Sequence, residues 1–156
     1  MSKRISVMIV EDSRVVSEYL TFVINSDPRL EVIKAVKSGE EALETLRTLK
    51  PDVISLDIRL PGMNGLEATT RIMSEYPTPI VVVASDIDDE SLQISMHALS
   101  AGALAVVQKP VGLSHKDYLS IAQSLCTKLA IMSEIRVIRQ RFRSTIHDRK
   151  AHSSTL

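Results

Sequence analysis

The stretch Val53–Gly65, which reads VISLDIRLPGMNG, decides the predicted fold. Its first four residues show little alternation of apolar and polar positions, a pattern typical of a short strand buried on both faces. A carboxylate, Asp57, follows at once. Four residues that favour a loop come soon after it: Pro61, Gly62, Asn64 and Gly65. We interpret the strand as a rigid support that presents Asp57 to a ligand beyond the strand's carboxyl end.

The composition is that of one globular domain with a small appendage. The chain has 156 residues, of which 44% are hydrophobic, and its formal net charge is zero. A sizeable core is therefore possible, and the overall charge makes no case for nucleic acid. The single cysteine, Cys126, excludes an internal disulfide framework and suits a reducing cytoplasm. Because no apolar run approaches the roughly 18–20 residues of a membrane span, we expect a cytoplasmic protein without membrane association.

Four further apolar runs have the character of Val53–Leu56. They are short and rich in Val, Ile or Ala: Ile5–Val10, Leu30–Val36, Ile80–Ala84 and Ala103–Val107. Segments with a period near 3.6 separate them: Ser13–Ser26, Ser38–Leu49, Leu66–Tyr76, Glu90–Ala101 and a last segment that Ser114 opens. Five strands in strict alternation with five helices predict an α/β domain, doubly wound around a parallel sheet.

The last helical pattern is longer than the domain needs. It runs from about His115 to Lys150, beyond the usual range of roughly 8–20 residues. Its second half places five apolar residues near heptad spacing: Met132, Ile135, Ile138, Phe142 and Ile146. Residues 131–150 hold six Arg or Lys and two acids. We therefore predict a main domain over residues 1–129 and, over 130–156, a helical extension or interdomain linker with a frayed tail.

Polar and charged side chains follow four of the predicted strands. Glu11 and Asp12 follow the first, Asp57 the third, Ser85 the fourth and Lys109 the fifth. Each has an ordinary explanation by itself, such as a helix cap for Asp12 or a solvated surface position for Lys109. The carboxyl ends of parallel strands meet at one edge of the sheet, so the joint placement predicts a shared site.

The residue types in this cluster suit phosphoryl transfer. Three carboxylates repel one another unless one is protonated or a cation lies between them, and oxygen ligands suit Mg²⁺. We therefore predict Mg²⁺ among Glu11, Asp12 and Asp57, with Asp57 as a nucleophile toward a phosphoryl group. Lys109 would neutralise phosphoryl charge, and the Ser85 hydroxyl would donate to a phosphoryl oxygen.

The ordered motifs resemble the response regulator receiver domain of two-component signalling over roughly residues 4–125. The resemblance rests on the Glu11-Asp12 pair, LDIRLPGMNGLEA around Asp57, Ser85, and Lys109-Pro110. It implies a flavodoxin-like (βα)5 fold with strand order 2-1-3-4-5. It also implies phosphorylation by a sensor histidine kinase, a conformational switch that controls a partner or attached output domain, and no enzymatic activity beyond self-phosphorylation and self-dephosphorylation.

Position by position, the resemblance makes Asp57 the phosphoacceptor. Asp12, Asp57 and the backbone carbonyl of Arg59 would be Mg²⁺ ligands, and Glu11 would act as the second acid through water. Aspartate is commoner than glutamate at the position of Glu11, and the longer side chain extends the reach to the ion.

The resemblance also assigns the phosphoryl-binding groups. Ser85 would be the switch hydroxyl and Lys109 the phosphoryl-binding lysine, and the Lys109–Pro110 peptide would be cis. Two positions depart from the family pattern. Val106 stands where an aromatic switch residue is frequent, which weakens the usual coupling of hydroxyl and aromatic side chain, and Gln108 stands where an apolar residue is usual.

A narrower resemblance is to the receiver of chemotaxis protein-glutamate methylesterases. It rests on NSDPRLEVIKAVKSGEEALE, LDIRLPGMNGLEATTRIMSEYPTPIVVVAS and ALSAGALAVVQKP, and MSEIRVIRQR resembles their interdomain linker. The sequence has no Gly-x-Ser-x-Gly elbow, so the hydrolase domain of that class is not expected here. The chain would be either a receiver with its linker or a stand-alone relative, served by a chemotaxis-type kinase.

Two other functions fit parts of the sequence. A Mg²⁺-dependent aspartyl phosphatase usually has a second Asp two residues after its nucleophile, but Arg59 stands there and cannot act as an acid at neutral pH. The basic helix over 131–150 could form a homodimer, bind a partner protein or bind nucleic acid. Base-reading aromatics are absent apart from Phe142, which favours self-association or a solvated linker over nucleic acid.

Overall fold

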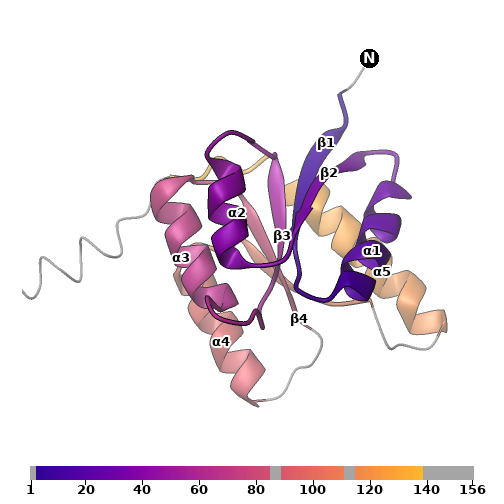
Figure 1. The fold of residues 1–156 in the computed structure, drawn as a ribbon. Coiled ribbons are helices and arrows are strands. Elements are labelled where there is room, and N and C mark those ends of the chain that lie inside the picture. Colours follow the sequence, from indigo (N-terminus) through magenta and orange to yellow (C-terminus); the bar gives the residue numbers. More distant parts are fainter. Residues whose placement is uncertain (1–2, 85–88, 111–114, 139–156) are drawn as a thin grey trace, which may run out of the picture.

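The computed structural model describes residues 3–84, 89–110 and 115–138 (Figure 1). Its strands are β1 (Ile5–Val10), β2 (Leu30–Val36), β3 (Val53–Asp57), β4 (Ile80–Ala84) and β5 (Ala105–Gln108). Its helices are α1 (Arg14–Asn25), α2 (Gly39–Leu46), α3 (Gly65–Glu75), α4 (Asp89–Ser100) and α5 (His115–Met132). The predicted alternation of strand and helix is confirmed, and β5 begins later than expected, at Ala105.

The strands form one parallel sheet with the order β2-β1-β3-β4-β5, as the resemblance implied. Val10 of β1 pairs with Leu56 of β3, and Ala84 of β4 pairs with Gln108 of β5. These pairs are the last or nearly the last residues of their strands. The residues that follow β1, β3 and β5 therefore emerge along one edge of the sheet.

Two apolar clusters enclose the sheet, one on each face. Because successive strand residues point to opposite faces, Ile54 and Leu56 enter the cluster closed by α2, α3 and α4, and Val53 enters the cluster closed by α1 and α5. Figure 1 shows the same division of the helices between the two sides. All residues of β3 and β4 are buried, which confirms the prediction that these strands are covered on both faces.

The helix α5 is the longest in the described part of the chain, at 18 residues, but it ends at Met132. The prediction of a continuous helix as far as Lys150 is wrong for residues 133–138, where the chain turns. Ser133 donates its hydroxyl to the Ala130 carbonyl, and the turn allows the half-buried Val137 to pack against the cluster that α2, α3 and α4 close. Residues 139–156 lie outside the described residues.

None of the described helices is both long enough and apolar enough to cross a membrane.

Candidate functional site

The predicted site forms at the edge of the sheet where β1, β3 and β5 end. Glu11 directly follows β1 and is 2% exposed, and Asp57 is the last residue of β3 and is 4% exposed. Asp12, the neighbour of Glu11, is exposed to solvent. Lys109 directly follows β5 and is buried, which rules out the reading of this residue as a solvated surface lysine.

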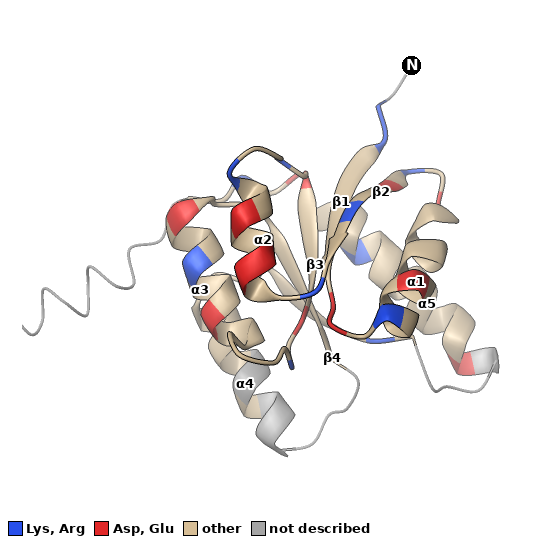
Figure 2. Cartoon of the chain, viewed as in Figure 1, with Lys and Arg blue, Asp and Glu red and all other residues tan. Residues whose placement is uncertain are grey.

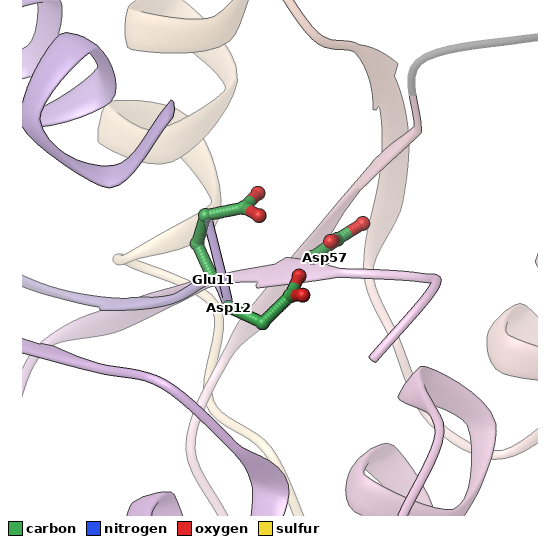
Figure 3. Close-up of side chains that lie close together, drawn as sticks. All are labelled: Glu11, Asp12 and Asp57. Carbon is green, nitrogen blue, oxygen red and sulfur yellow. The ribbon is translucent and has the colours of Figure 1, made fainter. Parts of the chain in front are cut away.

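The three carboxylates lie close together (Figure 3). Each of Glu11, Asp12 and Asp57 offers an oxygen within 4.8 Å of the others. The Lys109 ammonium joins this cluster, because its Nζ lies 2.8 Å from Glu11 Oε1 and 3.2 Å from Asp57 Oδ2. The structure thus brings together four of the side chains that the sequence placed at strand ends.

Backbone N–H groups hold the two buried carboxylates in place. The Ser13 N–H donates to Glu11 Oε2 at 3.1 Å, and the Arg59 N–H donates to Asp57 Oδ1 at 3.1 Å. Each buried carboxylate therefore has one oxygen beside a backbone N–H and the other beside Lys109. Neither N–H contact was among the groups predicted from the sequence, which were the carbonyl of Arg59 and side-chain groups elsewhere.

Ser13, and not Asp12, caps the first helix. The Ser13 hydroxyl accepts a hydrogen bond from the Val16 N–H at the start of α1. Ser, Asp and Asn are all favourable at this position, so the sequence alone left Asp12 as an alternative cap. With Ser13 in that role, the Asp12 carboxylate is left to the acidic cluster.

Burial and charge act on the titratable groups in opposite directions. Burial raises the pKa of Glu11, the contact with Lys109 opposes this, and the nearby charge of Asp57 adds to it. Burial alone would lower the pKa of Lys109, but the contacts with Glu11 and Asp57 outweigh it, and the pKa of Lys109 is raised. Lys109 is therefore a charged ammonium at neutral pH.

The loop after Asp57 folds back tightly onto the end of β3. A Cβ atom on Gly65 would lie 2.7 Å from Ile58 Cα and 2.8 Å from the Asp57 carbonyl oxygen, so no larger residue fits without a backbone shift. Gly62 has a φ of 71°, a conformation that glycine adopts readily. Leu60 and Met63 of the same loop are buried and anchor it. The Gly-containing loop is thus a fixed wall of the site.

This arrangement can be set beside known proteins. Residues 7–117 match the response regulator receiver domain. The chain belongs to this family.

Two curated proteins that the chain is similar to are protein-glutamate methylesterases. The chain is 61% identical over 140 residues to "Protein-glutamate methylesterase/protein-glutamine glutaminase 2" of Paramagnetospirillum magneticum. The matched region covers 90% of this chain and 40% of that protein. It is 44% identical over 136 residues to the corresponding protein of Nitrosospira multiformis, covering 87% and 38%. The chain therefore spans about two fifths of the length of the curated relatives it matches.

A solved receiver has the same fold and related sequence. The response regulator domain of Thermotoga maritima CheB superposes with a TM-score of 0.75 at 34% identity, covering 86% of this chain and 99% of that one. The receiver described here is thus of the type found in CheB response regulators. The fold and family inferred from the strand-end motifs are confirmed.

The donor set of this receiver fits a small divalent cation. The described residues Glu11, Asp12 and Asp57 supply hard carboxylate oxygens, which Mg²⁺ prefers, and the exposed Asp12 leaves room for the waters that this ion retains. Three carboxylates against one ammonium leave two negative charges, which one divalent cation balances. The cluster is thus compatible with Mg²⁺ in charge and ligand chemistry.

Two predictions about the site, for Ser85 and for the Lys109–Pro110 peptide, are not confirmed. Ser85 lies outside the described residues, so its role as switch hydroxyl stays a prediction. The expectation of a cis Lys109–Pro110 peptide is wrong, since the described residues contain no cis peptide bond. The trans form is favoured for X–Pro bonds in general, by about 0.5–1 kcal/mol.

Proposed function

We propose that this receiver accepts a phosphoryl group on Asp57 from the phosphohistidine of a sensor kinase. The observation that carries the proposal is the fixed position of the Asp57 carboxylate, between the Arg59 N–H and the Lys109 ammonium and beside two further acids. Receiver family membership supports the same role. The three carboxylates and the lysine come from ends of three different strands, which a purely structural ion pair would not require.

We propose that Asp12, Asp57 and the Arg59 carbonyl hold Mg²⁺, with Glu11 acting through water. When bound, the ion supplies positive charge that offsets the repulsion among the carboxylates and the charge of the phosphoryl oxygens. In its absence Lys109 is the cation that the described part of the site brings to Glu11 and Asp57.

In the reaction, an Asp57 carboxylate oxygen forms a bond to phosphorus while the phosphorus–nitrogen bond of the donor histidine breaks. The electron pair of that bond stays on the leaving imidazole, which is released neutral after it takes a proton. Lys109 neutralises the charge of the transferred group, because its Nζ is 3.2 Å from Asp57 Oδ2. Attack of water on the acyl phosphate later restores the carboxylate and releases inorganic phosphate.

The switch starts at Lys109. Phosphorylation adds negative charge at Asp57, which strengthens the attraction of Lys109 to the phosphoryl group at the expense of its contact with Glu11. We assign to Ser85 the role of a hydroxyl donor to the phosphoryl group. Val106, half-buried against the cluster that α2, α3 and α4 close, takes the position of the frequent aromatic residue, so its small side chain limits any coupled rotamer change.

The similarity to protein-glutamate methylesterases supports a chemotaxis-type kinase as donor and an output domain or partner as target. In this proposal residues 1–129 form the receiver, residues 130–156 form a linker, and the chain has no activity beyond its own phosphorylation and dephosphorylation. A cytoplasmic location stays a prediction. Homodimerisation through the extension is an alternative mode of output.

Phosphate-affinity gel electrophoresis after treatment with acetyl phosphate and Mg²⁺ tests the proposal. The wild type is expected to shift in mobility, and Asp57→Asn is expected not to shift. Asp52→Asn is the matched control, because Asp52 lies just before the other end of β3, where its carboxylate accepts from the Ser6 N–H and hydroxyl. No shift in the wild type, or an equal shift in Asp57→Asn, contradicts the proposed role.

A further inference from the structure

The chain crosses from one side of the sheet to the other after α5. Helix α5 packs in the layer that also contains α1, but Val137 packs against the opposite cluster, which α2, α3 and α4 close. In the view of Figure 1 the last described stretch of the ribbon reaches the C-terminal end of α3. The last described residues therefore lie on the side of the sheet that α2, α3 and α4 cover.

A groove lies between α2 and α3, with a volume of about 270 Å³. Leu43 and Met63 contribute buried apolar surface to it, and Tyr76, at the C-terminal end of α3, is partly buried there. The exposed Glu40 and Glu44 of α2 and the partly exposed Glu75 of α3 line it as well, together with Arg47 and Arg71. The groove thus combines an apolar interior with a charged margin in which three acids face two arginines.

The two helices around the groove carry an excess of negative charge. Residues 39–47 and 65–75 contain five glutamates and two arginines. Both arginines already have acidic partners, since Arg47 contacts Glu44 at 3.2 Å and Arg71 contacts Glu75 at 2.7 Å. Figure 2 shows acidic residues on both helices. The surplus of three negative charges is available to a basic ligand.

The sequence directly after the described residues is basic. Residues 139–150 contain four arginines and one lysine against a single acid, with Phe142 and Ile146 as apolar members. Helix α3, of 11 residues, is about 16 Å long, and twelve residues of extended chain span up to about 40 Å. This segment therefore has the charge, the apolar residues and the reach to occupy the whole groove.

We propose that residues 139–150 dock on the α2–α3 groove of the same molecule. The arginines of the segment face Glu40 and share Glu44 and Glu75 with Arg47 and Arg71, and Phe142 covers the apolar interior. Met63 belongs to both the groove and the loop that follows Asp57, so the docked segment contacts the wall of the phosphoacceptor site. This docking requires no phosphoryl group on Asp57.

Paramagnetic relaxation measured by NMR tests this contact in the full chain. A nitroxide is attached to Thr145→Cys, and the native Cys126 is spared because burial raises the pKa of its thiol to about 11. The expected result is selective loss of amide signal in α2 and α3, with α1 and α5 unaffected. The loss is expected to disappear in about 1 M NaCl, where the Debye length falls to roughly 3 Å.

Matched variants separate the groove from general electrostatics. Glu40→Gln with Glu75→Gln is expected to abolish the signal loss. Glu18→Gln is the control. Glu18 pairs with Arg14 four residues away, as Glu75 pairs with Arg71, but it lies on α1 and not beside the groove. The proposal is overturned if the broadening is uniform or absent, if it falls on α1 and α5, or if the groove variants do not change it. It is also overturned if ¹⁵N-labelled chains without a nitroxide show the same broadening when they are mixed with chains that carry the nitroxide, because the contact would then be between molecules.

Discussion

The Lys109 ammonium lies 2.8 Å from the Glu11 carboxylate, and both groups are buried. A buried ion pair is weak evidence for stability as a whole, but removal of one partner leaves the other charge uncompensated. The pair therefore ties the fold of this edge of the sheet to the charge of the phosphoacceptor site.

Lys109→Met is expected to lower the free energy of unfolding by about 3 kcal/mol at pH 7 in EDTA, because Glu11 and Asp57 lose their buried cation. Urea unfolding measures the change. The exposed Lys50→Met serves as control and is expected to stay within about 0.5 kcal/mol of the wild type. An equal, small effect of both substitutions would show that the buried contacts carry no net interaction.

Mg²⁺ is expected to raise the melting temperature of the wild type. It is not expected to raise that of the double variant that combines Asp12→Asn and Asp57→Asn. At a concentration 100 times its dissociation constant the ion stabilises the folded state by about 2.7 kcal/mol. Because burial raises the pKa of Glu11, this carboxyl takes up its proton at a higher pH than usual, and the gain in stability is expected to shrink as the pH falls toward 5. Thermal melts with Mg²⁺ and with EDTA at pH 7 and pH 5 measure both effects. A gain that is equal in the double variant would place the ion elsewhere.

Gly65→Ala is expected to destabilise the fold by about 1–3 kcal/mol and to slow phosphorylation, because the new Cβ meets the backbone of Ile58 and Asp57. Gly39→Ala is the matched control at the first position of another helix. There the Cβ would meet the end of the flexible Met63 side chain at 2.8 Å, which can move. Chemical unfolding and the rate of acetyl phosphate labelling compare the two variants. A similar outcome for both would show that the loop behind Asp57 is not fixed by this close approach.

The pKa of Asp27 is lowered by its hydrogen bond from the Arg29 guanidinium. A carboxyl with a depressed pKa in the folded state contributes stability that is present above its unfolded pKa of 3.8 and is lost as the pH falls through the lower folded pKa. Arg29→Gln is therefore expected to be less stable than the wild type at pH 6, and the difference is expected to close in acid below that range. Urea unfolding across the acid range measures it. A difference that persists unchanged into acid would mean that Arg29 acts through some other contact.

Local patterns in the sequence predicted most of the fold. Buried runs such as Val53–Leu56 identified the strands, and Ser13 and Ser38 cap α1 and α2, at the starts of two predicted helices. The end of α5 was not predictable in this way, because the apolar period continues past Met132. The turn there depends on a tertiary contact of Val137 with a cluster built from distant parts of the chain.

The site was predictable as a set of residue types and not as a set of contacts. Positions after strands placed Glu11, Asp57 and Lys109 on one edge, because parallel strands end together. The N–H contacts of Ser13 and Arg59 had no signature in the sequence, since a backbone donor exists at every residue except proline. Only the backbone path after β1 and β3 directs these two donors to the carboxylates.

Borohydride trapping after treatment with acetyl phosphate and Mg²⁺ tests the central claim most directly. Borohydride reduces an acyl phosphate at aspartate to homoserine, and peptide mass spectrometry then locates the changed residue. Homoserine is expected at position 57, and only in samples that received acetyl phosphate before borohydride. Trapping at Asp12 or at another carboxylate, or no trapping in a protein that remains folded and binds Mg²⁺, would contradict it.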